Sequence, residues 1–99
     1  MNKSLPEPHS FEWDEAKAVA NLEKHGVSFE EAQKAFLDRK RILFRDLNHS
    51  DDEERFFCVG KIDGEVLTVR YTLRGRKIRI YGAGYWRTGR RLYEEENRL

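Results

Sequence analysis

The stretch RFFCVGKIDGEVLTVRYTL, residues 55–73, predicts a β-hairpin. Its strands alternate in polarity, and the central pair Asp63-Gly64 favours a tight two-residue turn, because both residues of that turn adopt positive φ. Pairing outward from the turn fixes which residues face each other. The expected pairs are Ile62 with Glu65, Cys58 with Val69, and Phe56 with Tyr71.

This register divides the sheet into two faces. The apolar face is expected to support the helices and consists of Phe56, Cys58, Ile62, Leu67, Val69, Tyr71, Ile78 and Ile80. The opposite face receives Phe57, Arg70, Thr72, Arg79 and Tyr81. A four-residue turn at 73–76 would set Arg70 directly across from Arg79, which costs some tenths of a kcal/mol. Either acidic side chains neutralise these arginines, or the face binds a polyanion.

Helices flank these strands. A helix over 14–24 is predicted, with Asp14 as N-cap, Gly26 as its stop and a buried stripe of Ala16, Val19, Ala20 and Leu22. A second helix begins at Ser28, whose spacing to Glu31 is that of a capping box, and ends near 37–38. It buries Phe29, Ala32, Ala35 and Phe36. Further strands are expected at 42–44 and 77–81, and a last helix over 90–97 that starts as early as Trp86. The fold class is therefore α+β, with two N-terminal helices, a four-stranded antiparallel sheet and a C-terminal helix.

With 99 residues, 38% of them hydrophobic and 12% aromatic, the chain has room for one core. Residues 1–10, which contain Pro6 and Pro8, are expected to form a flexible tail before a single domain over 11–99. There is no signal peptide and no apolar run of about 20 residues, so a cytoplasmic protein without membrane contact is expected. The single cysteine, Cys58, rules out an intramolecular disulfide and falls on the core face.

Charge is unevenly distributed along the chain. Residues 1–54 contain 8 Lys/Arg and 13 Asp/Glu, whereas residues 55–99 contain 11 Lys/Arg and 5 Asp/Glu. Between 70 and 91 there are eight basic residues and no acid, interleaved with Tyr71, Tyr81, Tyr85 and Trp86. Arginines suit phosphates and aromatic rings suit bases, so the pattern leaves two interpretations open, a solvated charged face and a nucleic-acid-binding surface.

RNA cleavage needs little beyond such a surface, because the 2′-hydroxyl is the nucleophile. The enzyme aligns it, stabilises the charge on the phosphorane and assists proton transfer. The candidate catalytic residues are Arg55, Arg70, Arg79, His25 and Tyr93; the candidate RNA-binding residues are Arg74, Arg76, Lys77, Arg87, Arg90, Arg91, Tyr81 and Trp86. Simpler roles exist for two of them: His25 caps the first helix and Tyr93 packs on the sheet.

A metal site is not expected. His9, His25 and His49 are scattered, and the acidic run at 51–54 is typical of a solvated loop. The glycines at 82, 84 and 89 do not have the spacing of a phosphate-binding loop and are read as turn residues.

Several motifs together resemble the BrnT family of toxins from type II toxin–antitoxin systems. They are Phe11-Glu12-Trp13-Asp14, NLEKHGVSFEEA at 21–32, Asp52-Glu53-Glu54-Arg55, Ile78-Arg79-Ile80 and Arg90-Arg91-Leu92-Tyr93-Glu94-Glu95. The resemblance implies a RelE-like ribonuclease fold and metal-independent, cofactor-free RNA cleavage that arrests translation. It also implies a BrnA-type ribbon-helix-helix antitoxin, two toxins on one antitoxin dimer, and repression of the operon through operator DNA.

The chain departs from the family after the last strand. Where many members have Ser-Ala-Arg, this sequence has Gly82-Ala83-Gly84, and Gly89 replaces an expected acid. Arg87, one turn further on, is a candidate to fill the vacated place of the arginine. Two functions therefore stay open: a ribonuclease toxin, or a catalytically weak basic module that binds the antitoxin and acts as co-repressor. A free-standing RNA-binding protein is a third, less favoured interpretation.

Overall fold

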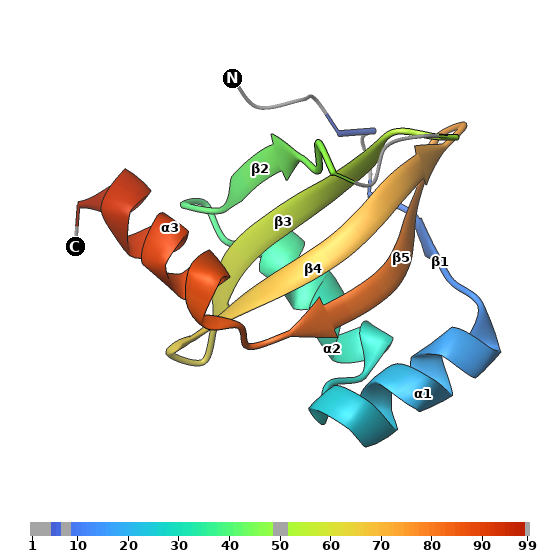
Figure 1. The fold of residues 1–99 in the computed structure, drawn as a ribbon. Helices are drawn as coiled ribbons and strands as arrows, with labels where there is room; N and C mark the ends of the chain where they lie inside the picture. Colours follow the sequence, from blue (N-terminus) through green and yellow to red (C-terminus); the bar gives the residue numbers. More distant parts are fainter. Residues whose placement is uncertain (1–4, 7–8, 49–51, 99) are drawn as a thin grey trace.

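A computed structural model describes residues 5–6, 9–48 and 52–98, so the tail predicted over 1–10 lies partly outside the described residues. A five-stranded sheet with strand order β1-β5-β4-β3-β2 forms its centre, and helices lie on both of its sides (Figure 1). The elements are β1 (Phe11–Glu12), α1 (Glu15–His25), α2 (Phe29–Ala32), the 3₁₀ helix η1 (Gln33–Leu37), β2 (Ile42–Arg45), β3 (Arg55–Ile62), β4 (Glu65–Arg74), β5 (Lys77–Gly84) and α3 (Arg87–Asn97).

The central hairpin of β3 and β4 is confirmed, except that β4 continues to Arg74, one residue beyond its predicted end. Asp63 and Gly64 have φ of 49° and 86°, as the tight turn requires. The pairs predicted from the turn are present, and all eight residues assigned to the apolar face are buried. Local turn chemistry and a period of two were sufficient here because they act within one short segment.

The predicted four-stranded antiparallel sheet is wrong in one respect, since a fifth strand makes the sheet mixed. β1 pairs in parallel with β5, with Phe11 beside Ile78 and Glu12 beside Arg79. The backbone N–H of Ile78 donates to the carbonyl of Ser10 at 2.8 Å. A strand of two residues is too short to show the alternation of apolar and polar side chains that identifies a strand in a sequence. β1 is therefore recognised only from its pairing with β5.

Arg70 and Arg79 do not face each other, contrary to the sequence prediction. The turn between β4 and β5 has two residues rather than four, with Gly75 at φ 60°, so Thr72 stands opposite Arg79. A bulge then shifts the register between Arg70 and Tyr71, and Arg70 stands opposite Gly82. β5 also continues to Gly84, beyond its predicted end. The two arginines consequently lie in separate surroundings.

The helices cover the two faces unequally. α2 and η1 bury Phe29, Ala32, Ala35 and Phe36 on the apolar face, as predicted, although the second half of that helix is 3₁₀. η1 comes so close to β3 that a Cβ at Gly60 would collide with the Ala35 carbonyl. α3 packs on the other face, where Tyr93 joins Val59 and Val66 in a second small core. The rest of that face remains open.

The predicted buried stripe of α1 is wrong. Val19 and Leu22 are 55% and 51% exposed, and Ala16 and Ala20 are exposed too. The helix instead buries Ala18 and Asn21. The Asn21 amide donates to the Val27 and Ala83 carbonyls, both at 3.0 Å, and its Oδ1 accepts from the Ala83 N–H at 3.1 Å. α1 is thus held to β5 by a polar side chain rather than by an apolar face.

We expect Asn21→Ala to lower the free energy of unfolding by about 2–4 kcal/mol, because it leaves three buried backbone groups without their partner. Asn48→Ala, at an exposed position, should change it by less than about 0.5 kcal/mol. Urea denaturation of the three proteins measures both values. Equal stability of the two variants would show that α1 is held by something other than this amide.

Candidate nucleic-acid interface

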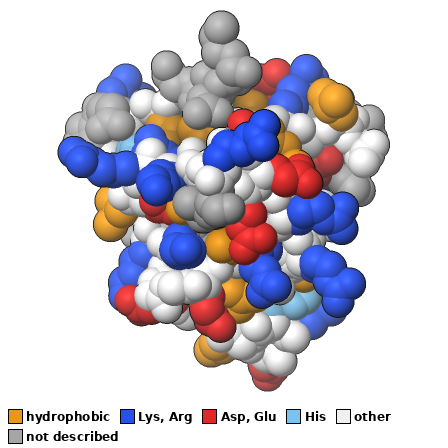
Figure 2. All heavy atoms as spheres, turned by 90° about the vertical axis from the view of Figure 1, so that its left-hand side faces the viewer, with side chains coloured by type: hydrophobic (Ala, Val, Ile, Leu, Met, Phe, Trp, Pro, Cys, Tyr) orange, Lys and Arg blue, Asp and Glu red, His pale blue; other side chains and the backbone are white. Residues whose placement is uncertain are grey.

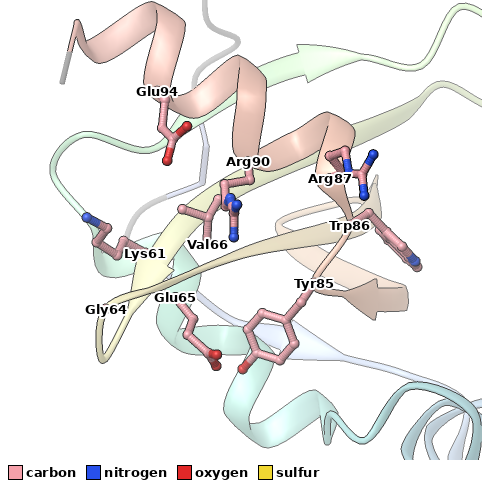
Figure 3. Close-up of a pocket in the computed structure, with 9 residues that line it drawn as sticks. All are labelled: Lys61, Gly64, Glu65, Val66, Tyr85, Trp86, Arg87, Arg90 and Glu94. Carbon is pink, nitrogen blue, oxygen red and sulfur yellow. The ribbon is translucent and has the colours of Figure 1, made fainter.

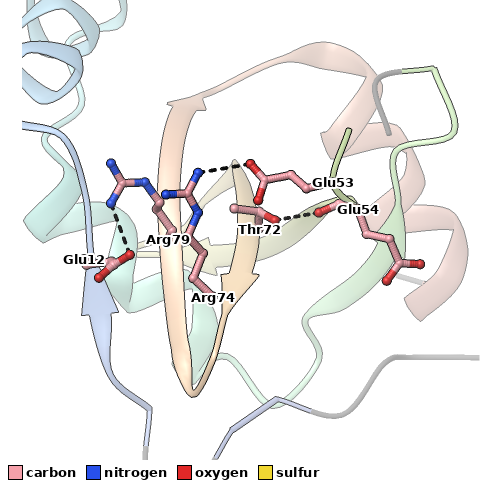
Figure 4. A network of polar contacts seen from close by, with 6 residues as sticks. All are labelled: Glu12, Glu53, Glu54, Thr72, Arg74 and Arg79. Atoms are coloured by element: carbon pink, nitrogen blue, oxygen red, sulfur yellow. Dashed lines mark hydrogen bonds and ion pairs between the residues drawn. The ribbon is translucent and has the colours of Figure 1, made fainter. Parts of the chain in front are cut away.

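The arginines at the β4–β5 turn end of the sheet are paired with carboxylates (Figure 4). Arg79 contacts Glu12 at 3.1 Å and Arg74 contacts Glu53 at 3.2 Å. Glu53 belongs to the acidic run at 51–54, of which Asp51, like His49, lies outside the described residues. The hydroxyl of Thr72 donates to the Glu54 carbonyl at 2.6 Å and fixes the end of that run. For Arg74 and Arg79, neutralisation by acidic side chains is therefore the arrangement found.

A different group of basic side chains surrounds a hollow of about 290 Å³ between α1 and the far end of β5, which we call the basic hollow. It is lined by Lys17, Ala20, Asn21, Lys24, His25, Arg70, Tyr81, Gly82 and Trp86. No carboxylate belongs to this lining. Within the described part of the chain, Lys17, Lys24 and Arg70 form no ion pair. Their charges are thus uncompensated, which concentrates positive potential at this place.

Trp86 lines the basic hollow and packs against two of its other residues. The guanidinium of Arg70 lies over its ring, 5.5 Å from the ring centroid, and the ring of His25 meets it edge-on at 5.2 Å. His25 is the last residue of α1, Arg70 lies in β4, and Trp86 is the residue before α3. Three distant segments therefore bring a cation, an imidazole and a stacking surface together.

Two glycines of β5 make room for this cluster. A Cβ at Gly84 would lie 2.6 Å from the Trp86 ring, and one at Gly82 would lie 3.0 Å from Cδ of Arg70. The space vacated at Gly84 is therefore filled by Trp86, and the prediction that Arg87 fills it is wrong. The sequence predicts that Gly82 and Gly84 are turn residues; this prediction is wrong, because both lie within β5.

Tyr81 and Arg55 extend the site along the open face of the sheet. The Arg55 guanidinium lies 5.0 Å from the centroid of the Tyr81 ring. Burial raises the pKa of Tyr81 above its ordinary value, although the charges of Arg55 and Arg70 offset part of the rise. At neutral pH the phenol is therefore protonated and is able to donate a hydrogen bond or a proton.

Tyr93 lies apart from this cluster. It is only 2% exposed, and its hydroxyl donates to Oδ2 of Asp38 at 2.5 Å. Burial and this bond raise the pKa of Tyr93 to about 12. Burial alone would raise the pKa of Asp38, but hydrogen bonds from Tyr93 and from the backbone N–H groups of Lys40 and Lys61 outweigh it and lower that pKa. Tyr93 thus holds α3 to the loop before β2, the packing role considered for it.

The remaining predicted residues lie in three places. Arg76 and Lys77 are at the β4–β5 turn and Arg91 is on the exposed side of α3. Arg87 and Arg90 line a second hollow of about 480 Å³, between the first turns of α3 and the β3–β4 turn (Figure 3). The face that lies on the left in Figure 1 carries many Lys and Arg side chains with carboxylates between them (Figure 2).

Sequence reasoning missed Lys17 and Lys24, which form the α1 wall of the basic hollow. They are seven residues apart and hence lie on the same side of a helix, which is the signal that was available. The spacing of the two lysines did not identify them, because the sequence predicts that α1 buries its apolar residues and gives no reason to expect a site on the side with the lysines.

Other chemistry finds less support in the described residues. No group of three or more His, Cys, Asp or Glu is arranged there to hold a metal ion, and no helix there is long and apolar enough to cross a membrane. Cys58 is fully buried, and burial raises the pKa of its thiol. It packs in the core as a small apolar side chain.

Comparison with known protein families identifies a family to which the chain is similar. The family model described as "Ribonuclease toxin, BrnT, of type II toxin-antitoxin system" matches residues 13–89. That span contains every residue that lines the basic hollow. No curated protein matches the sequence.

We expect Gly84→Ala to push the Trp86 ring away from Arg70 and His25, because the new methyl group needs the space that the ring occupies. The stability cost should be about 1–3 kcal/mol. In a ¹H–¹⁵N NMR spectrum the indole N–H signal of Trp86 should shift, while that of Trp13, which packs near Phe29, stays in place as an internal control. An unmoved Trp86 signal would contradict this placement of the ring.

Tyr93→Phe should lower the free energy of unfolding by about 1–2 kcal/mol at neutral pH, because a hydrogen bond to a charged acceptor is lost. Since folding raises the pKa of Tyr93 from 10.0 to about 12, its contribution is complete below pH 10 and is lost as the pH rises through 12. The difference from wild type should therefore shrink over that range in urea titrations. Tyr85→Phe, whose hydroxyl makes no hydrogen bond to described residues, serves as the control at neutral pH; an equal loss there would refute the assignment.

Proposed function

The chain belongs to the BrnT family of ribonuclease toxins of type II toxin–antitoxin systems, and from this premise we propose that it cleaves RNA in the basic hollow. The observation that carries the proposal is the uncompensated charge of Lys17, Lys24 and Arg70 around the partly exposed ring of Trp86. A phosphodiester brings the negative charge that these groups lack, and single-stranded RNA also brings bases for Trp86 to stack on.

The proposed reaction uses the 2′-hydroxyl of the RNA as nucleophile. It attacks the adjacent phosphorus, the P–O5′ bond breaks, and a 2′,3′-cyclic phosphate and a free 5′-hydroxyl are formed. One proton leaves the 2′-oxygen and one reaches the 5′-oxygen, so a base and an acid are needed. Arg70 stabilises the charge on the phosphorane oxygens through its fixed N–H groups, and Lys17 and Lys24 hold the strand by its phosphates.

We assign the proton transfers to His25 and Tyr81, which line the same hollow. Imidazole is the side chain that most often serves as a general base, which suits His25 to the 2′-hydroxyl. Tyr81 is kept protonated by burial, which suits it to the leaving 5′-oxygen. Arg55 lies over the Tyr81 ring and orients it from β3.

A type II toxin has an antitoxin partner, and we propose that this one is a BrnA-type ribbon-helix-helix protein. The basic hollow would bind cellular RNA if left open, so we propose that an acidic segment of the antitoxin covers it and folds as it docks. Because a ribbon-helix-helix protein is itself a dimer, the proposed assembly is two toxins on one antitoxin dimer, which represses its operon at operator DNA.

The test compares Arg70 with Arg79, two arginines of one sheet face that differ in pairing. Arg70→Gln should lower kcat/KM for RNA cleavage about 100-fold, as expected for a lost group that stabilises charge in the transition state. It should leave the melting temperature unchanged. Arg79→Gln should keep most of the activity and lose at most about 1 kcal/mol of stability, because its partner Glu12 is partly exposed. Cleavage of a labelled RNA and growth arrest on induction measure the activity of both variants, and thermal melting measures their stability.

Equal loss of activity in the two variants would refute the basic hollow as the site. A wild-type protein that binds RNA without cleaving it would support the alternative, a basic module that serves the antitoxin complex. That alternative is favoured by one observation, the absence of the family's Ser and Arg side chains at Gly82 and Gly84.

A further inference from the structure

The two hollows of this surface meet at Trp86. The residue lines the basic hollow together with His25 and Arg70, and it also lines the second hollow together with Arg87 and Arg90. Its ring is fixed on one side by Arg70, whereas its backbone leads directly into α3. A ligand that leaves the basic hollow past Trp86 therefore enters the second hollow.

The second hollow carries charges that form no ion pair with the residues that the structure describes. Lys61, Arg87 and Arg90 have no ion-pair partner within residues 9–48 and 52–98, and the carboxylates of Glu65 and Glu94 have none either. Arg87 and Arg90 project from successive turns of α3, while Lys61 comes from the end of β3 (Figure 3). Phosphate-binding groups are thus present here as well.

The lining is mixed, which distinguishes it from the basic hollow. Tyr85 is 45% exposed and lies at the same rim as Glu65 (Figure 3). Burial and the charges of Glu65, Glu31 and Asp63 raise the pKa of Tyr85, so its ring is neutral and borders acceptor groups. A nucleotide offers both a phosphate for the arginines and a base whose N–H groups donate to a carboxylate. The volume of about 480 Å³ is in the range of sites for small ligands, about 300–1,000 Å³.

We infer that the second hollow binds the nucleotide next to the cleaved one, so that single-stranded RNA runs from the basic hollow past Trp86 to Arg87, Arg90 and Tyr85. This inference rests on the proposed function, since it extends the same strand. Trp86 lies between the two nucleotides and sets the distance between the sites that bind them. An RNA longer than the dinucleotide that is cleaved should therefore bind more tightly than the dinucleotide, because its next nucleotide contacts the second hollow.

The test measures binding of fluorescein-labelled 2′-O-methyl RNA of two and of nine nucleotides by anisotropy at low salt; the methylated 2′-oxygen prevents cleavage. Arg90→Gln should weaken the nine-nucleotide complex about fivefold and leave the dinucleotide complex within about twofold of wild type. Arg39→Gln is the matched control, because Arg39 is exposed and lines neither hollow. Arg70→Gln should weaken both complexes.

The outcomes separate this inference from the proposed function. If Arg90→Gln and Arg39→Gln bind the nine-nucleotide RNA equally while Arg70→Gln is impaired, the second hollow is no RNA subsite and the basic hollow stands. If Arg70→Gln also binds both RNAs like wild type, the proposed function fails. A matching loss for both RNA lengths in Arg90→Gln overturns the inference too, because it would place Arg90 at the scissile nucleotides. Arg87→Gln repeats the test with an independent side chain, in case one variant does not fold.

Discussion

The hydrogen bonds between Asn21 and Ala83 determine how the functional surface is built. β1 pairs with β5 only at Ile78 and Arg79, so the end of β5 has a free edge. The Asn21 amide supplies a donor and an acceptor to Ala83 on that edge, and a second N–H bond to Val27 ties down the loop after α1. Buried polar groups without partners are costly, so this amide fixes the register between helix and strand as a ladder of backbone bonds would. Lys17, Lys24 and His25 are positioned by it.

Electrostatics then sorts the basic residues of the chain into two sets. Near the β4–β5 turn, Glu12 and Glu53 come from segments close to Arg79 and Arg74 and neutralise them. At the other end the described residues give Arg70 no ion-pair partner, and its guanidinium lies over a tryptophan instead. An arginine on an aromatic face keeps its N–H groups at the rim free for a ligand, whereas an arginine in an ion pair does not. The net charge of +1 hides this division.

The elements that were predicted from the sequence are those whose signals are local. Asp63-Gly64 and the alternation around it specify β3 and β4, and Asp14 and Ser28 cap their helices as expected. β1, the bulge after Arg70 and the inward side of α1 depend on distant partners, and no local pattern carries that information. The site follows the same rule. His25, Arg70, Tyr81 and Trp86 were identified by chemical type and do come together, but which arginines stay unpaired depended on where the acids fold.

The glycines of β5 show how the basic hollow is assembled on a strand that has no side chain at Gly82 and Gly84. A side chain at position 82 or 84 of β5 would project onto the open face of the sheet. Because both residues are glycine, Arg70 packs over Gly82 and the ring of Trp86 packs over Gly84. Gly89 is a similar case, because the hydroxyl of Thr68 occupies the space that a side chain at this position would need. Positive charge over β5 is thus supplied by Arg70 of β4, which lies over an aromatic ring. The cleavage that we propose therefore depends on how one indole ring, that of Trp86, packs in this chain.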